Sequence, residues 1–329
     1  MAQSKLQFQG GSRVSTIRNA LLICLPALLL LFGSGVQAQF RSPQMQIEQL
    51  TDSVYRYGGL TNGAFIVGSE GIAVVDGQIC GSNGTQWLKD ELTRRFDVPV
   101  KYVILSHDHE MHICGLEVFS DTARAVSHVN AKPHIIREGR RTVIPEITFD
   151  TTMRLDLGGI EVVLLYLGPT HTDNLIQVHI PSESVLIAVD FVREGKSLAM
   201  PELRDADIAN SIKALGVLGR MENADIVVPG HGGITDQKAF LYFRDYLVAL
   251  RERVLEQMAA GKGIEEILEI VTMEDFSDYG WFDQWIRSNV ITMWELMYHY
   301  REPTEGAGEY ERDFPIGFPV GEVDKFNGP

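Results

Sequence analysis

The sequence predicts a layered α/β (α+β) domain followed by a group of helices. Between residues 54 and 230, short apolar runs of strand length alternate with segments of helical periodicity, the pattern of α/β or layered α+β domains. From residue 237 onward, apolar residues recur at helical spacing instead. The chain has 329 residues, 45% of them hydrophobic, so it can bury a sizeable core.

The first 38 residues have the features of a secretory signal peptide. Three basic residues and no acidic one accompany an apolar run at 20–32, and small residues then lead to an Ala-x-Ala-like site ending at Ala38. The run is shorter than the roughly 20 residues of a membrane span, which favours cleavage over anchoring. We therefore expect the chain to be cleaved near Ala38 and exported, to the periplasm or the medium.

Charge and cysteine content narrow the expected partners. Loss of residues 1–38 removes three positive charges and no negative ones, which changes the formal net charge from −15 to −18. Such an acidic surface repels nucleic acid and anionic lipid, so we expect a small-molecule substrate, with no membrane contact after cleavage. Oligomeric state does not follow from the sequence. Cys80 and Cys114 then remain, either as one disulfide in an oxidising compartment or as free thiols.

The individual elements follow from periodicity and turn residues. Apolar runs bounded by turn residues predict strands, and apolar residues three or four positions apart predict helices. The predicted strands are 64–67, 71–75, 102–105, 152–157, 160–167, 175–180, 184–189 and 226–228. The predicted helices are 87–96, 208–218, 237–260, 264–271 and 281–300.

Five of the apolar runs end abruptly in a side chain that can bind a metal ion. Strand ends on one edge of a layered domain are where binding sites collect, because their loops converge. Imidazole and carboxylate groups are good zinc ligands. The residues at the five strand ends are Asp76; His107, His109 and His112; His171; Asp190; and His231. The other histidines, His128, His134, His179 and His299, are expected to lie on the surface or to be paired. Trp281, Phe282, Trp285 and Trp294 are expected to pack helices, with substrate contact by one of them as the alternative.

The series VVDG, SHDHEMHICG, GPTHT, AVD and VPGHG, in this order between residues 54 and 233, resembles the metallo-β-lactamase superfamily of metallohydrolases. The resemblance implies a four-layered αβ/βα sandwich with metal ions at one edge of two facing sheets. It divides the chain into a signal peptide (1–38), a metallo-β-lactamase-like domain (39–236), a C-terminal helical extension packed on it (237–302) and an irregular tail (303–329).

The resemblance also implies roles for the residues at the strand ends. His107, His109 and His171 match the ligands of a first metal ion. Asp190 matches a carboxylate that bridges two ions, and His112 and His231 match ligands of the second ion. Asp76 matches a buried carboxylate that orients the histidine loop.

Met111 departs from the family pattern. Relatives that use both ions read His-x-His-x-Asp-His, and Met111 stands where their aspartate binds the second ion. A thioether is a weak, uncharged ligand, so we expect one firmly held zinc ion and a second that is weak or absent. Glu110 could replace the aspartate only in a remodelled loop, because neighbouring side chains point in different directions. Since related diiron oxygen reductases favour Glu at the place of His109, zinc is preferred over iron.

The leading hypothesis is an exported zinc-dependent hydrolase. Zinc held by three histidines lowers the pKa of bound water to about 7 and polarises a carbonyl, which suits attack by metal-bound hydroxide on an ester, lactone, thioester or amide, including a β-lactam. Asp190 would position the water. The alternative is a catalytically weak or inactive metal-binding protein that binds a ligand or partner. A third hypothesis is redox or sulfur chemistry at Cys114, whose simpler interpretation is a small residue packed behind the loop. Loops 77–86 and 192–205 are expected to shape the pocket.

Overall fold

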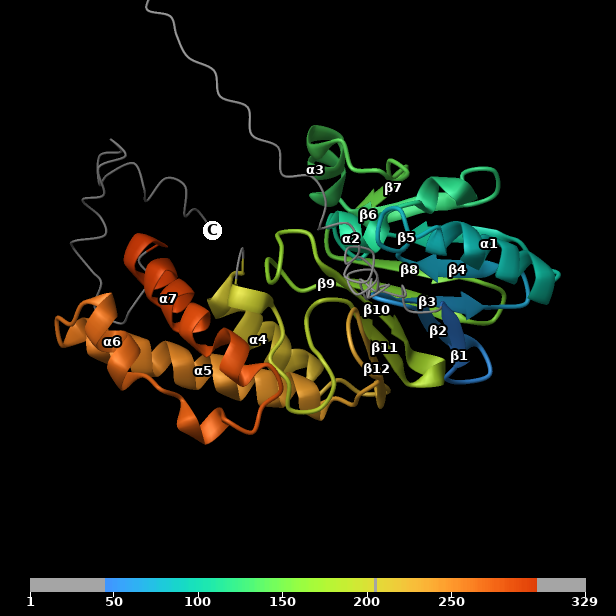
Figure 1. The fold of residues 1–329 in the computed structure, drawn as a ribbon. Coiled ribbons are helices and arrows are strands. Elements are labelled where there is room, and N and C mark those ends of the chain that lie inside the picture. Colours follow the sequence, from blue (N-terminus) through green and yellow to red (C-terminus); the bar gives the residue numbers. More distant parts are fainter. Residues whose placement is uncertain (1–44, 204–205, 301–329) are drawn as a thin grey trace, which may run out of the picture. The chain divides into compact units, whose positions relative to one another are not determined.

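The computed structural model describes residues 45–203 and 206–300 (Figure 1). The predicted signal peptide and irregular tail lie outside these residues. None of the helices in the described part of the chain combines the length and apolar character needed to cross a membrane.

Seven strands form the first sheet, in the order β1-β2-β3-β4-β5-β6-β7. The first four strands pair antiparallel and β4 to β7 pair parallel, so the strands change from a meander to crossover connections at β4. The strands are β1 (Gln46–Gln49), β2 (Val54–Gly58), β3 (Asn62–Val67), β4 (Ile72–Val75), β5 (Val100–Ile104), β6 (Arg124–His128) and β7 (Ile147–Phe149).

Five strands form the second sheet, in the order β12-β11-β10-β9-β8. Only β11 and β12 pair parallel, and the remaining neighbours are antiparallel. The strands are β8 (Thr152–Asp156), β9 (Glu161–Tyr166), β10 (Ile176–Ile180), β11 (Val185–Ala188) and β12 (Ile226–Pro229).

Helices cover the outer faces of both sheets (Figure 1). Against the first sheet lie α1 (Gly84–Arg95), α2 (Glu110–Ile113), the 3-10 helix η1 (Leu116–Phe119) and α3 (Ala131–Glu138). On the side of the second sheet lie α4 (Ile208–Leu218) and α5 (Lys238–Ala259), and α6 (Ile264–Ile270) and α7 (Phe282–Tyr300) pack on α5. Short 3-10 helices are η2 (Pro181–Glu183), η3 (Pro201–Leu203) and η4 (Glu274–Phe276).

Alternation along the strands divides the buried residues into three layers. In β3, Phe65 packs outward against the α1 residue Leu88, while its neighbour Ile66 packs inward between the sheets. In β11, Ile187 packs inward and Leu186 packs outward among the helices. The result is the predicted helix-sheet-sheet-helix arrangement, in which two facing sheets share a central core.

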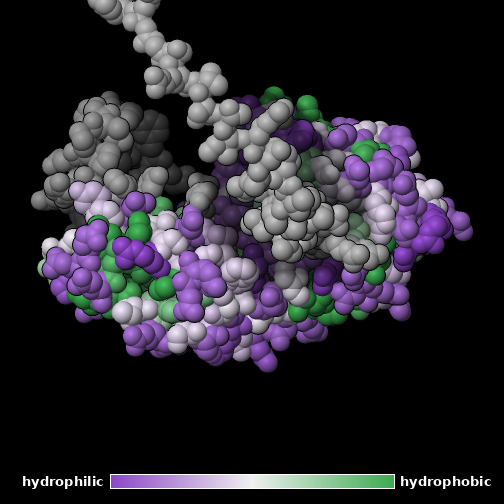
Figure 2. All heavy atoms as spheres, viewed as in Figure 1, coloured by the Kyte–Doolittle hydropathy of each residue, from purple (hydrophilic) through white to green (hydrophobic). Residues whose placement is uncertain are grey.

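The C-terminal helices share one core with the second sheet. The outer cluster joins Leu186 of β11 and Leu215 of α4 with Phe240 of α5, Ile267 of α6 and Met293 of α7. Hydrophilic residues predominate on the face shown in Figure 2.

The sequence predicted most strands and α-helices but missed β1, β2, the short α2 and the segment that contains β6, α3 and β7. His128, expected to lie on the surface or to be paired, is buried in β6, where its ring stacks on Tyr166 with centroids 3.7 Å apart. Its Nε2 lies 3.0 Å from the carbonyl oxygen of Asp150. His134 pairs with Asp173 at 3.0 Å on the surface, as expected.

Candidate metal centre

The ligand-capable residues predicted at the strand ends meet at one edge of the two sheets. Asp76 follows β4, the histidines of residues 107–112 follow β5, and His171 lies between β9 and β10. Asp190 and His231 follow β11 and β12, which are parallel neighbours and therefore end at the same edge. Asp76 and Asp190 both have left-handed backbone conformations, with φ of 65° and 52°. Such conformations are uncommon outside glycine but are tolerated by aspartate and asparagine.

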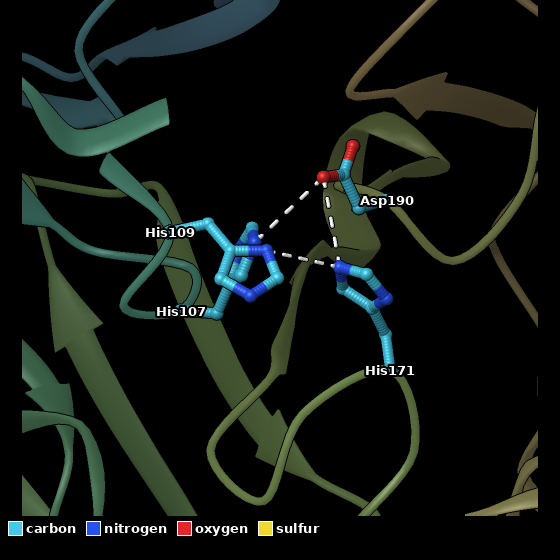
Figure 3. A group of neighbouring side chains, drawn as sticks. All are labelled: His107, His109, His171 and Asp190. Atoms are coloured by element: carbon cyan, nitrogen blue, oxygen red, sulfur yellow. Dashed lines mark hydrogen bonds and ion pairs between the residues drawn. The ribbon is translucent and has the colours of Figure 1, made fainter. Parts of the chain in front are cut away.

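Four side chains form a first group, shown in Figure 3. His109 Nδ1 and His171 Nε2 lie 3.1 Å apart. Asp190 Oδ2 lies 3.7 Å from His107 Nε2 and 3.8 Å from His171 Nε2. One ligand atom from each of the four residues lies within 4.8 Å of the others.

A second group shares Asp190 with the first. His112 Nε2 lies 2.9 Å from Asp190 Oδ2, and His231 Nε2 lies 3.3 Å from Asp190 Oδ1. Met111 is 41% exposed and lines the adjacent pocket. Glu110 belongs to neither group around Asp190, because its Oε1 accepts a hydrogen bond from Arg141 Nε at 2.9 Å.

The first group fits a zinc ion. Tetrahedral zinc with ligand bonds of about 2.1 Å places neighbouring ligand atoms roughly 3.4 Å apart, close to the 3.1 to 3.8 Å separations found here. His107 supplies a second sign: its Nδ1 lies 2.8 Å from Ser106 Oγ, while its buried Nε2 has no hydrogen-bond partner among the described residues. A buried nitrogen left in this state is costly in a folded protein unless another ligand binds it.

Burial keeps most of these imidazoles neutral, as metal binding requires. It lowers the pKa of His107, His109 and His231. Burial also lowers the pKa of His112, but the facing Asp190 carboxylate outweighs burial and leaves that pKa raised. Burial raises the pKa of Asp190, and the surrounding histidines, His112 foremost, outweigh burial and hold it well below its usual range. Asp190 is therefore the anion of the cluster.

Asp76 holds the loop of residues 106–112 in place through Ser106. Its Oδ1 and Oδ2 accept hydrogen bonds from the backbone N–H and the hydroxyl of Ser106, both at 2.8 Å. Ser106 in turn contacts His107 Nδ1, so the carboxylate fixes the orientation of that ring through one residue. Burial raises the pKa of Asp76 to about 6. Tyr57 donates a hydrogen bond of 2.6 Å to the Asp76 carbonyl.

A second polar network joins the loops of His109 and His171. The buried Asn174 amide donates hydrogen bonds of 2.8 Å to Asp108 Oδ1 and to Asp173 Oδ1. Arg140 also lies 3.6 Å from Asp108. Asp108, located between two of the histidines, is thus tied to the segment that follows His171. The sequence pattern did not predict a role for Asn174. Its position two residues after GPTHT, which contains the candidate ligand His171, could have indicated a residue that supports the site.

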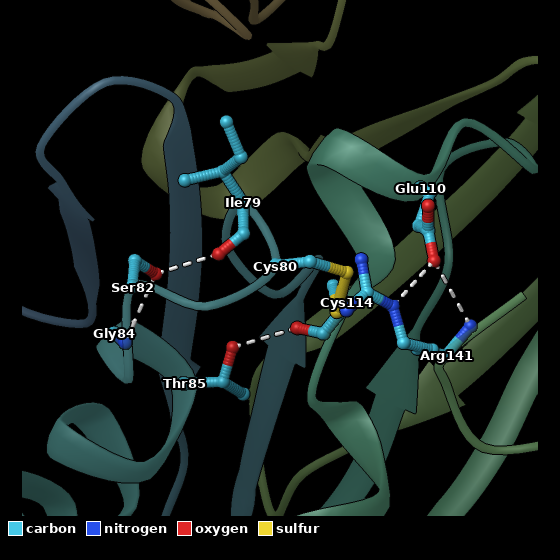
Figure 4. The surroundings of a disulfide bond; sticks show 8 residues. All are labelled: Ile79, Cys80, Ser82, Gly84, Thr85, Glu110, Cys114 and Arg141. Atoms are coloured by element: carbon cyan, nitrogen blue, oxygen red, sulfur yellow. Dashed lines mark hydrogen bonds and ion pairs between the residues drawn. A yellow bond between two sulfur atoms is a disulfide. The ribbon is translucent and has the colours of Figure 1, made fainter.

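Cys80 and Cys114 form a disulfide bond, the first of the two states that the sequence allowed (Figure 4). The bond links the loop after β4 to the residue that follows α2. Backbone hydrogen bonds reinforce the link, from Gly77 to the His112 carbonyl at 2.5 Å and from Gln78 to the Cys114 carbonyl at 3.3 Å. With both sulfur atoms bonded to each other, the free-thiol chemistry considered for Cys114 has no thiol in this state.

A pocket of about 480 Å³ opens beside the two groups. Its lining residues from the site are His109, Met111, His171, Asp190 and His231, and the others are Val192, Arg193, Ala199, Met200, Pro201 and Glu202. The expectation that loop 192–205 shapes the pocket is met by these six residues, whereas loop 77–86 contributes no lining residue. Sequence reasoning did not single out Arg193, three residues after Asp190.

Comparisons with known proteins extend these observations. The Metallo-beta-lactamase superfamily model matches residues 56–231. The metallo-beta-lactamase type 2 of Bacteroides fragilis is 27% identical over 217 residues, 62% of this chain and 86% of that protein. The 2,4-dinitroanisole O-demethylase subunit alpha of Nocardioides sp. (strain JS1661) is 26% identical over 288 residues, 82% of this chain and 84% of that protein. The solved metallo-beta-lactamase from Pontibacter korlensis has the same fold, with a TM-score of 0.57 and 20% identity over 62% of this chain and 99% of that one.

Proposed function

We propose, from the premise that the chain belongs to the metallo-β-lactamase superfamily, that it is an exported hydrolase that works with one firmly held zinc ion. The observation that carries this proposal is the buried His107 Nε2, which faces Asp190 and has no hydrogen-bond partner among the described residues. His109 and His171 complete the ligand set at separations that suit zinc.

In the proposed hydrolase, different residues of the chain bind the metal ion, orient its ligands and position water. Bound zinc supplies a water of lowered pKa and a Lewis acid for a carbonyl oxygen. His107, His109 and His171 hold the ion, and Ser106 and Asp76 keep the His107 ring in place. Asp190 is ionised and lines the pocket, so its carboxylate can orient a water molecule by accepting a hydrogen bond from it.

The proposed substrates are esters, lactones, thioesters and amides, with a β-lactam as one case. The O-demethylase relative adds an activated aryl methyl ether to the candidates, because its match spans 82% of this chain and must therefore include residues after 237. The lactamase relative from Bacteroides fragilis spans 62%. A substrate panel should therefore contain both classes.

Export is part of the proposal. The disulfide between Cys80 and Cys114 supports it, because such bonds persist in oxidising compartments and are rare in the cytosol. Mass spectrometry of protein recovered from periplasmic extract and culture medium tests this point. A mature chain that begins at Gln39 is expected, and a chain found only in the cytosol with residues 1–38 intact would contradict export.

A second candidate function is metal-dependent binding of a ligand or partner without efficient catalysis. Met111 favours it, because an exposed thioether lines the pocket where the family's two-metal members have a carboxylate. This candidate predicts bound zinc without turnover.

Zinc analysis together with a hydrolysis panel distinguishes the two. We expect about one zinc per chain, turnover of at least one substrate, and loss of both in His107→Ala. His179→Ala is the matched control, since His179 Nε2 lies 2.6 Å from the Asn223 carbonyl oxygen, toward the end of β10 that is farther along the chain from His171. Full zinc loading with no hydrolysis across the panel would favour the binding protein, and His107→Ala with undiminished turnover would refute the proposed site.

A further inference from the structure

The wall of the pocket opposite the histidines comes from one segment of the chain. Among the described residues, the segment 192–202 contributes the lining side chains outside the ligand groups and Met111. Val192, Ala199, Met200 and Pro201 are the apolar members of this set, and Arg193 and Glu202 are the charged ones. We call these six residues the selectivity wall. With Met111 facing the same space, a substrate bound at the histidines meets a largely apolar surface.

The side chain of Arg193 is turned onto two tryptophans of the C-terminal helices. Its guanidinium carbon lies 5.3 Å from the ring centroid of Trp281 and 5.6 Å from that of Trp285. The two indoles stack on each other, with centroids 5.3 Å apart and planes 15° from parallel. A guanidinium over indole faces gains a cation–π attraction, which is stronger when the group is partly desolvated. The wall's cation is therefore anchored by residues from the start of α7.

The backbone of the same segment is tied to the same helices. Ser197 forms a parallel bridge with Gly280: the Leu198 N–H donates to the Gly280 carbonyl at 3.0 Å, and the Gly280 N–H donates to the Lys196 carbonyl at 2.8 Å. Lys196 Nζ also lies 2.8 Å from Asp278 Oδ2. Two backbone hydrogen bonds and one ion pair thus fix the segment just before the wall's apolar members.

Backbone angles at the end of the selectivity wall are unfavourable in isolation and depend on packing against α7. Met200, Glu202 and Leu203 have φ of 52°, 59° and 50°, in the left-handed region. Such residues persist when their surroundings determine the conformation, and they cluster at ligand-binding sites. Here Met200 and Leu203 are buried in one cluster with Met293 of α7, and η3 packs against α7.

We infer that the selectivity wall chooses the substrate of this site, that it favours a substrate whose non-reacting part is apolar, and that the C-terminal helices hold the wall in place through Trp281, Trp285 and Gly280. This inference rests on the proposed zinc site and adds to it the chemical class of the substrate. The helices after residue 237 are then part of the binding site, although none of their described side chains lines the pocket.

Binding of two zinc-chelating probes tests the wall without requiring turnover. Acetohydroxamic and benzohydroxamic acid share one chelating head and differ in the apolar tail. Isothermal titration of the zinc-loaded chain is expected to give benzohydroxamic acid an affinity at least about tenfold higher, because its ring is removed from water against the wall. Equal affinities, or a preference for the smaller probe, would overturn the inference.

Substitutions in the selectivity wall and its anchor test whether these residues cause the preference for benzohydroxamic acid. Val192→Thr keeps the shape and adds a hydroxyl to the wall, and Trp281→Ala removes the anchor of Arg193; each is expected to reduce the benzohydroxamate preference at least about threefold. Their matched controls are Val217→Thr on the exposed face of α4 and Trp294→Ala, whose ring stacks on Tyr298. Controls that lose the preference equally would overturn the assignment to the wall.

A milder pair keeps the test valid if Trp281→Ala unfolds the chain. Asp278→Asn breaks the ion pair with Lys196, whereas Asp275→Asn breaks the pair with Arg253 in the same stretch but away from the wall. Only Asp278→Asn is expected to weaken benzohydroxamate binding, and equal effects would count against the inference. Probe preference without ester cleavage would refute only the hydrolase proposal, and ester cleavage without probe preference would refute only the wall.

Discussion

Removing the Cys80–Cys114 disulfide should destabilise the chain by an amount that follows from its position. The bond closes a loop over a sequence separation of 34 residues. Loop-closure entropy in the unfolded chain then corresponds to about 3.8 kcal/mol at 25 °C. The double variant Cys80→Ser/Cys114→Ser should therefore have a free energy of unfolding lower by roughly 3 to 4 kcal/mol.

Urea unfolding followed by tryptophan fluorescence measures this loss. The expected shift of the midpoint is roughly 1 to 2 M toward lower urea. Reductant should shift the wild type by the same amount and leave the double variant unchanged, which separates the bond from any effect of the serine side chains. The single variant Cys80→Ser should match the double variant, because either change removes the same bond.

Zinc retention gives a second readout of the same change. The disulfide holds the residue after α2 against the loop after β4, next to the backbone bond from Gly77 to His112. Dialysis against a weak chelator should therefore remove zinc faster from the double variant. A double variant that unfolds at the wild-type urea concentration would refute the entropic account, and unchanged zinc loss would refute the link to the histidine loop.

Three further predictions concern the site itself. Met111→Asp supplies the missing carboxylate and should raise bound zinc from about one toward two per chain; an unchanged ratio and unchanged turnover would contradict our account of Met111. Asp76→Asn keeps an amino acid that tolerates φ of 65° but removes one acceptor for Ser106, so zinc affinity should fall roughly 10- to 100-fold by competition with a chelator. Burial raises the folded pKa of Asp76 to about 6, so its ionisation lowers the stability of the metal-free wild type as pH rises. The variant-minus-wild-type difference in unfolding free energy should increase by about 2 kcal/mol between pH 4 and 6 and level off above about pH 7; a flat difference throughout would contradict the shift. Asn174→Ala removes the amide that donates to the carboxylates of Asp108 and Asp173, which should lower the free energy of unfolding by about 1 to 3 kcal/mol and weaken zinc binding. Asn289→Ala, which removes the buried hydrogen bond to Tyr246 between α7 and α5, should leave zinc binding unchanged.

The sequence predicted the layered fold and the place of the ligand-capable residues for one physical reason. Strands that end at the same edge of a sheet bring their following residues together, whatever the loops between them do. His107 and His231 are far apart in the chain, yet both follow apolar runs of strand length. Parallel pairing of β11 and β12 then places Asp190 beside His231.

The prediction missed β6 because periodicity does not register its kind of burial. β6 reads Arg124–His128 and contains only two apolar residues. It is buried because its polar side chains find partners: Ser127 Oγ donates to the His128 carbonyl at 2.9 Å. Periodicity counts apolar residues and cannot register burial that depends on hydrogen bonds formed elsewhere in the fold.

The pocket wall and the disulfide depend on contacts between segments that are distant in the chain, and the spacing of residues along the sequence does not reveal such contacts. Residues 192–203 have little periodicity, and three of their left-handed positions are occupied by Met200, Glu202 and Leu203 rather than by glycine. Packing against α7, almost a hundred residues later in the chain, holds them there. Likewise, the pairing of Cys80 with Cys114 requires the loop after β4 to lie against α2.

The shared outer core affects how the chain is made. A ribosome finishes His231, and with it every ligand-capable residue of the site, before it reaches α5. At that moment the outer cluster that contains Leu186 of β11 still lacks Phe240 and Met293. Incompletely covered sheets are prone to aggregate while they wait for later segments. A polypeptide stopped after His231 would thus carry the complete set of metal-binding side chains on a second sheet whose outer side has α4 but still lacks α5, α6 and α7.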